Sequence, residues 1–141
     1  MILVADTGAL YALYDADDTH HQAVRLAVEE HDGPILVPTA ILSEIDYLLR
    51  EHLGVDAELD FLASLKSGAF QLEELTAEDL DRCVELLQRY RKLDLGLADS
   101  AVIATAERRG TLHILTVDER DFRAVVSRRG RPFVLVPADR S

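Results

Sequence analysis

The chain has 141 residues, which fits a single domain over 1–141 with a hydrophobic core of its own. Hydrophobic residues make up 48% of the sequence, which excludes a disordered chain, and no apolar run is long enough to span a membrane. The formal net charge of −11 counts against binding nucleic acid, because an acidic surface repels phosphates. With one cysteine and no signal-peptide pattern behind MILVA, we expect a cytoplasmic protein.

The first half of the chain alternates short apolar runs with segments of helical periodicity. In chain order we expect a strand over 1–5, a helical turn over 7–13, a helix from 17–19 to about 31, a strand over 35–37, a helix that Pro38 opens and Gly54 ends, and a helix over 56–66.

The second half continues the same alternation. In chain order we expect a strand over 70–72, a helix capped at Thr76 that runs to Tyr90, a loop over 93–98, a helix over 99–109, a strand over 113–116 and a strand over 133–136. In the helix after Thr76, Cys83 shares one face with Leu80, Val84 and Leu87, so we interpret this cysteine as a core residue.

Short apolar strands separated by helices indicate an α/β fold around a mostly parallel central sheet of four to five strands, flanked by helices. In such sheets ligands bind at the carboxyl ends of the strands. Asp6 follows the first strand and Asp118 follows the strand over 113–116, so two carboxylates are expected at this edge.

Two further acids lie on helices. Glu44 borders the apolar face formed by Ile41, Ile45 and Leu48, where it either pairs with a base, reaches solvent or serves a site. Asp99 opens a helix whose inward positions are apolar, and its alternative role is to favour the helix N-terminus.

Convergent carboxylates have a definite chemical use, because Mg²⁺ and Mn²⁺ prefer oxygen ligands and crowded acids need a cation to stay ionised. Such an ion activates water and stabilises charge on a phosphoryl group. The sequence contains no P-loop, no G-x-S-x-G and no H-E-x-x-H motif that would support another mechanism.

Acidity is unevenly distributed along the chain. Residues 1–80 contain 17 acidic and 3 basic residues, whereas residues 81–141 contain 9 acidic and 12 basic residues. The basic C-terminal part is either ordinary surface variation or a surface for a nucleic acid. Net acidity therefore does not exclude RNA as a partner.

Four segments in order resemble the motifs of PIN-domain ribonucleases. Ile2–Leu10 is similar to the first motif, Ser43-Glu44 to the second, Asp94–Glu107 to the third and Leu115–Phe122 to the fourth. Each motif alone is weak, but all four occur in the family's order over the whole chain. The resemblance is strongest to the VapC-type toxins of toxin–antitoxin pairs, which are single small PIN domains.

This resemblance implies a PIN-like fold and an endoribonuclease that depends on Mg²⁺ or Mn²⁺, forms a homodimer and is inhibited by a cognate antitoxin. It assigns metal binding and catalysis to Asp6, Glu44, Asp99 and Asp118. Supporting roles fall to Thr7, Asp94, Thr116 and Asp121. Some relatives carry Asn at the position of Asp118, so the fourth acid is either Asp118 or Asp121. The apolar helices over 41–49 and 59–65 are the expected dimer interface.

Two other functions fit part of the pattern. A Mg²⁺-dependent phosphatase or phosphoacceptor also uses an aspartate at a strand end, but Asp6-Thr7-Gly8 lacks a second Asp two residues on, and the only lysines are Lys66 and Lys92. A non-catalytic PIN module that binds RNA or protein is the other alternative, since a fold alone does not prove activity.

Overall fold

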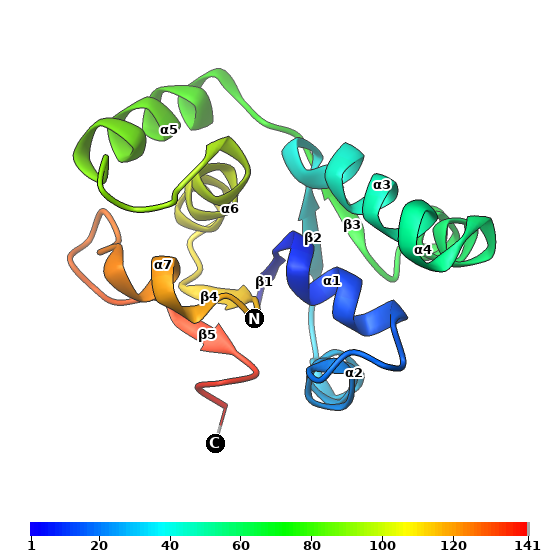
Figure 1. The fold of residues 1–141 in the computed structure, drawn as a ribbon. Coiled ribbons are helices and arrows are strands. Elements are labelled where there is room, and N and C mark those ends of the chain that lie inside the picture. Colours follow the sequence, from blue (N-terminus) through cyan, green and yellow to red (C-terminus); the bar gives the residue numbers. More distant parts are fainter. Residues whose placement is uncertain (141) are drawn as a thin grey trace.

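A parallel β-sheet forms the centre of the computed structural model, which describes residues 1–140 (Figure 1). The strands are β1 (Leu3–Ala5), β2 (Ile35–Pro38), β3 (Gln71–Glu73), β4 (His113–Leu115) and β5 (Val134–Val136). Their order is β3-β2-β1-β4-β5, and every pairing is parallel, as in Val4 with Leu36 on one side and Val4 with Ile114 on the other. The expected α/β fold is confirmed.

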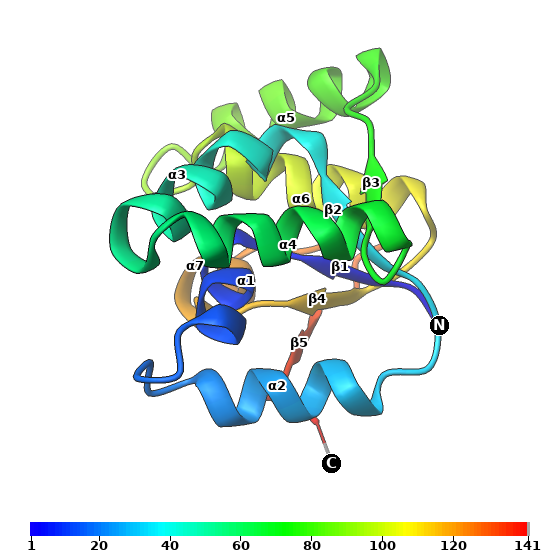
Figure 2. The same cartoon turned by 90° about the vertical axis from the view of Figure 1, so that its right-hand side faces the viewer.

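Helices cover both faces of this sheet. They are α1 (Thr7–Tyr14), α2 (His21–Glu30), α3 (Leu42–Leu53), α4 (Val55–Ser67), α5 (Ala77–Arg89), α6 (Leu97–Arg108) and α7 (Glu119–Ala124), with a 3-10 turn η1 at Thr39–Ile41. Helices α5 and α6 lie above the sheet and α2 below it in Figure 2. No helix within residues 1–140 is long and apolar enough to cross a membrane.

Burial on both faces explains why the central strands read as continuous apolar runs. Leu3, Val4 and Ala5 are all buried, as are Ile114 and Leu115. A parallel strand covered on both sides has no solvent face, so polar residues are displaced to its ends. The first polar residue that follows β1 is Asp6, at the carboxyl edge of the sheet.

The strand order places a topological switch at the centre of the sheet. From β1 the chain moves outward through β2 and β3, then returns to add β4 on the other side of β1. Loops leave β1 and β4 in opposite directions at this point, which is where ligands bind in open α/β sheets. Helix α6 leads into β4 and runs against the strand direction, so the first turn of α6 lies at the same edge.

Three boundaries differ from the sequence-based expectation. Pro38 ends β2, where a terminal strand position needs no N–H from proline, and it is also the N-cap of η1, so the expected helix opens with a 3-10 turn before α3. Helix α6 begins at Leu97 with Gly96 as its N-cap, so Asp99 lies inside the first turn. Helix α7 was not expected as a helix, because six residues are too few for a periodic pattern.

The buried face of α5 also differs from the prediction. Cys83 is buried, as expected, but Leu80, Val84 and Leu87 are 46%, 53% and 37% exposed. The buried face instead joins Cys83 to Ala101 and Ala104 of α6. Small side chains on α6 allow close helix packing, so the larger residues on the flank of α5 remain outside.

Candidate metal centre

Asp6 is held at the carboxyl edge by a residue from the neighbouring strand. The Thr116 hydroxyl donates a hydrogen bond to Asp6 Oδ2 at 3.1 Å, and the backbone N–H of Asp118 donates to Thr116 Oγ1 at 3.0 Å. Asp6 N in turn donates to the Leu115 carbonyl at 2.9 Å, which continues the ladder between β1 and β4. This network fixes the orientation of the Asp6 carboxylate.

The start of α1 and the segment after β4 pack closely against each other. A Cβ at Gly8, in the first turn of α1, would lie 3.2 Å from Cγ2 of Val117, which follows β4. A side chain at this position would push the segment that carries Asp118 away from Asp6. Glycine therefore permits the approach of α1 to the end of β4.

The Asp6 carboxylate is costly to ionise where it lies. Its side chain is buried, and this desolvation raises its pKa to about 6, with smaller contributions from the charges of Asp118 and Glu44. Hydrogen bonds from the Thr7 backbone and the Thr116 hydroxyl oppose the rise. A nearby cation would remove most of the penalty.

The pKa of Asp99 is raised further than that of Asp6, by burial and by the other acids. Partial burial is the largest cause that raises its pKa to about 7, and the charges of Asp6, Asp118, Asp121 and Glu44 add to it. The N-terminus of α6 favours a carboxylate in its first turn. The raised pKa of Asp99 means that burial and repulsion outweigh this favourable effect of the helix. An acid that only stabilised the helix N-terminus would not be subject to such burial and repulsion.

Asp118 and Asp121 complete a cluster with Asp99. One carboxylate oxygen from each of these three residues lies within 4.8 Å of the others. Asp118 is exposed, whereas Asp121 is only 4% exposed and its Oδ1 atom accepts no hydrogen bond within residues 1–140. Nε of Arg120, whose side chain lies on the surface, is 3.7 Å from Asp121 Oδ1, which is too far for a hydrogen bond.

The remaining candidates occupy different positions. Glu44 is exposed in the first turn of α3, but its charge acts on both Asp6 and Asp99, so it faces the cluster. Thr7 is buried, and its hydroxyl has no hydrogen-bond partner in the described chain. Asp94 is exposed in the loop before α6, and its charge is not among those that raise the pKa of Asp6 or Asp99. Its supporting role remains a prediction.

The chemistry of the cluster fits a hard divalent cation. All the side chains that could contact an ion there offer oxygen atoms, and several acids share one small region. Because a buried carboxylate oxygen without a partner costs free energy, the bare Oδ1 atom of Asp121 calls for a positively charged ligand. The sequence left the fourth acid open between Asp118 and Asp121, because the buried position of Asp121 in the first turn of α7 has no signal in the sequence.

A parallel sheet with acidic side chains gathered at its topological switch places this chain in the class of α/β proteins whose ligand site lies at the carboxyl ends of the strands. Comparison with known families makes the assignment specific. The PIN domain family matches residues 3–127, and the chain belongs to this family.

Relatives of known identity agree with this assignment. The chain is 33% identical over 135 residues to Ribonuclease VapC26 of Mycobacterium tuberculosis, covering 96% of this chain and all of that protein. Its fold matches the crystal structure of VapC20 of the same species, a toxin that cleaves the Sarcin-Ricin loop, with a TM-score of 0.79, 23% identity and coverage of 86% and 93%.

A further solved structure has the same fold. It is a toxin–antitoxin complex from Klebsiella pneumoniae, with a TM-score of 0.70, 20% identity and coverage of 87% of this chain and 92% of that one. At this identity the match shows the fold alone.

Proposed function

We propose that this chain is an endoribonuclease that depends on Mg²⁺ or Mn²⁺ and acts as the toxin of a toxin–antitoxin pair. The observation that carries the proposal is the group of acids at the switch point, where burial and mutual repulsion raise the pKa of Asp6 to about 6 and of Asp99 to about 7. Membership of the PIN family and the ribonuclease relative connect this chemistry to RNA. Its single cysteine and an RNA substrate favour the cytoplasm as the place of action.

Asp6, Asp99 and Asp118 would hold the ion, together with Glu44 and Asp121. The bound ion supplies a Lewis acid that lowers the pKa of water and neutralises charge on the phosphoryl oxygens. Thr116 keeps Asp6 in one orientation through its hydrogen bond to Oδ2. The partly exposed Asp99 carboxylate is placed to accept a proton from water that reaches the site.

The direct test compares two aspartate-to-asparagine variants. Asp6→Asn will remove RNA cleavage by the purified chain, because the buried carboxylate is replaced by a weak, neutral ligand. Asp94→Asn, the same change at an exposed acid outside the cluster, will cleave at the wild-type rate. Gel analysis of cleaved RNA measures both. Full activity in Asp6→Asn would refute the site, and an inactive wild type would favour a non-catalytic PIN module.

The toxin role has its own test, because the acidic site favours a silencing partner that inserts an Arg or Lys. Expression of the wild-type chain will slow bacterial growth, Asp6→Asn and Glu44→Gln will relieve this, and co-expression with the antitoxin will relieve it through a complex that survives purification. A wild-type chain that is harmless at good expression would argue instead for a housekeeping PIN nuclease.

A homodimer formed through α3 and α4 is part of the proposal. Tyr47, Val55 and Leu59 are 63%, 50% and 56% exposed there, which is an unusual apolar content for one solvent-facing surface. Sedimentation at micromolar concentration will show a dimer, and Leu59→Glu will dissociate it by placing a charge in the interface. Val84→Glu on α5 is the matched control. If only Val84→Glu dissociates the dimer, the interface lies on α5, and a wild-type monomer would contradict the proposal.

A further inference from the structure

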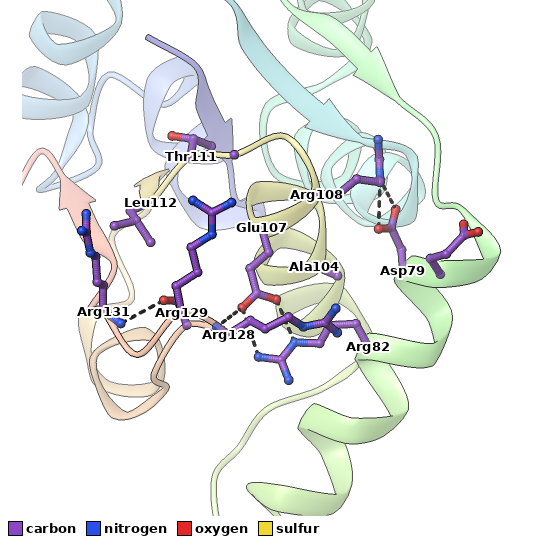
Figure 3. A pocket seen from close by; sticks show the side chains of 13 residues that line it. Asp79, Arg82, Ala104, Glu107, Arg108, Thr111, Leu112, Arg128, Arg129 and Arg131 are labelled. Atoms are coloured by element: carbon purple, nitrogen blue, oxygen red, sulfur yellow. Dashed lines mark hydrogen bonds and ion pairs between the residues drawn. The ribbon is translucent and has the colours of Figure 1, made fainter.

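A cavity lies at the amino edge of the sheet, at the opposite end of α6 from Asp99. It has a volume of about 450 Å³ and is enclosed by α5, the last turn of α6 and the turn before β5 (Figure 3). Asp99 lies in the first turn of α6 and Arg108 in its last, which separates the two sites by about 14 Å at 1.5 Å per residue. Arginines dominate the lining of this cavity.

The turn that carries three of these arginines is rigid. Gly130 N donates to the Ser127 carbonyl at 2.8 Å, Ser127 N donates to the Arg131 carbonyl at 3.1 Å, and Arg131 N donates to Ser127 Oγ at 3.1 Å. Gly130 has a φ of +78°, which glycine adopts without strain. The turn therefore presents Arg128, Arg129 and Arg131 on a fixed backbone.

Glu107 attaches this turn to the body of the fold. Its Oε2 atom accepts the backbone N–H of Arg128 at 2.6 Å, and its carboxylate receives Arg82 Nε at 2.7 Å and Nη2 at 3.1 Å. The side chains of Arg82 and Glu107 are only 12% and 11% exposed, so this ion pair is shielded from solvent. The pair joins α5, α6 and the turn.

Two arginines of the cavity remain without a carboxylate. Arg82 forms an ion pair with Glu107, and Arg108 forms ion pairs with Asp79 and Glu73. Arg128 approaches only Glu85, at 3.7 Å. Arg129 and Arg131 form no ion pair anywhere in residues 1–140. Their side chains extend from the turn in the same direction, toward Thr111 and Leu112 (Figure 3).

The three acids on the wall do not cancel this charge. Asp79 and Glu107 are each bound to an arginine, and Glu78 stands alone at the exposed start of α5. Among the residues that line the cavity, five arginines stand against three acids, and Arg129 and Arg131 are the two arginines that no carboxylate pairs with in the described chain. Guanidinium groups on a rigid backbone suit a phosphate group, because they donate paired hydrogen bonds to its oxygens.

We propose that this cavity binds a phosphate group, held by Arg129 and Arg131 with the Ser127 hydroxyl beside them. The phosphate comes either from the RNA backbone, at a distance from the cleaved bond, or from a free phosphate compound such as a mononucleotide. The first source rests on the proposed ribonuclease function, whereas the second does not. A phosphate from either source would accept hydrogen bonds from the same side chains.

The first experiment measures the binding of inorganic phosphate to the metal-free full chain by calorimetry at constant ionic strength. The pocket variant is Arg129→Ala with Arg131→Ala, which breaks no ion pair. The control is Arg25→Ala with Lys66→Ala, which removes the same charge from the exposed faces of α2 and α4. We expect wild type and control to bind phosphate and the pocket variant to lose at least tenfold in affinity. Equal binding by all three chains, or none by wild type, would overturn the proposal.

The second experiment identifies the source of the phosphate. A fluorescent oligouridylate is titrated at several salt concentrations with metal-free chains that also carry Asp99→Asn, so that cleavage during the titration is negligible. If RNA supplies the phosphate, the pocket variant will lower the slope of log affinity against log salt by about 1 to 2, and the control will not. An unchanged slope with lost phosphate binding assigns the site to a free phosphate compound. Failure of the ribonuclease proposal appears separately, as absence of cleavage by wild type.

Discussion

Replacing Asp99 by asparagine will reduce RNA cleavage by on the order of 10³-fold, the loss typical of removing one charge-stabilising group from a catalytic site. The structure gives the reason, because Asp99 shares one small region with Asp118 and Asp121 and its charge is coupled to Asp6 and Glu44. Asparagine keeps the shape of the side chain and removes the negative charge that attracts a cation. Initial rates of cleavage measure the effect.

The same substitution will stabilise the metal-free fold at neutral pH. Burial and the surrounding acids make the Asp99 charge unfavourable, and after allowance for solvent screening its removal is expected to contribute about 1–2 kcal/mol to the free energy of unfolding. Thermal unfolding in the presence of chelator measures this gain, with Asp94→Asn as the matched control. Loss of stability with full cleavage would show that Asp99 only supports the start of α6.

Chelation of divalent ions will stop cleavage completely, and the metal-free chain will show an unusual dependence of stability on pH. The pKa of Asp99 is about 7 in the fold against 3.8 for an unperturbed side chain, so the folded chain keeps a proton that the unfolded chain has lost. Its stabilising effect is fully present below about pH 4 and disappears as pH rises to about 7. Asp6, with a pKa of about 6, acts in the same direction.

Addition of Mg²⁺ or Mn²⁺ will reverse this trend. A cation binds the ionised acids, so it will raise the unfolding temperature most above pH 7 and little near pH 5, where protons compete for the same oxygens. Thermal unfolding across this pH range, with and without the ion, provides the measurement. Asp99→Asn will reduce the metal-induced shift. Identical pH profiles with and without the ion would contradict a metal site at the cluster.

The sequence alone was sufficient to predict the α/β fold and the positions of Asp6 and Asp118. Buried parallel strands have no polar face, so the apolar runs and the acids that follow them are visible without coordinates. Asp121 was harder to place, because a six-residue helix such as α7 has no periodic signature. Its buried carboxylate becomes apparent only when α7 is in place.

Other features depend on contacts between distant parts of the chain. The hydrogen bond from Thr116 to Asp6 joins residues 110 positions apart, and the contact of Glu107 with Arg82 joins two helices. The exposed stripe of Leu80 and Val84 has the same spacing as a buried one, and the small residues on α6 decide which face of α5 packs inward. The spacing of apolar residues in one helix does not determine which other helix packs against it.

The strand order has a consequence for the timing of activity during synthesis. Asp6 leaves the ribosome more than 100 residues before β4, which lies beside β1 and positions Thr116 and Asp118. A nascent chain that ends before β4 can pair β1 with β2 and β3, yet it lacks Asp118 and Asp121, two of the five acids at the switch point. The complete acidic cluster therefore forms only after β4 has been translated and has paired with β1.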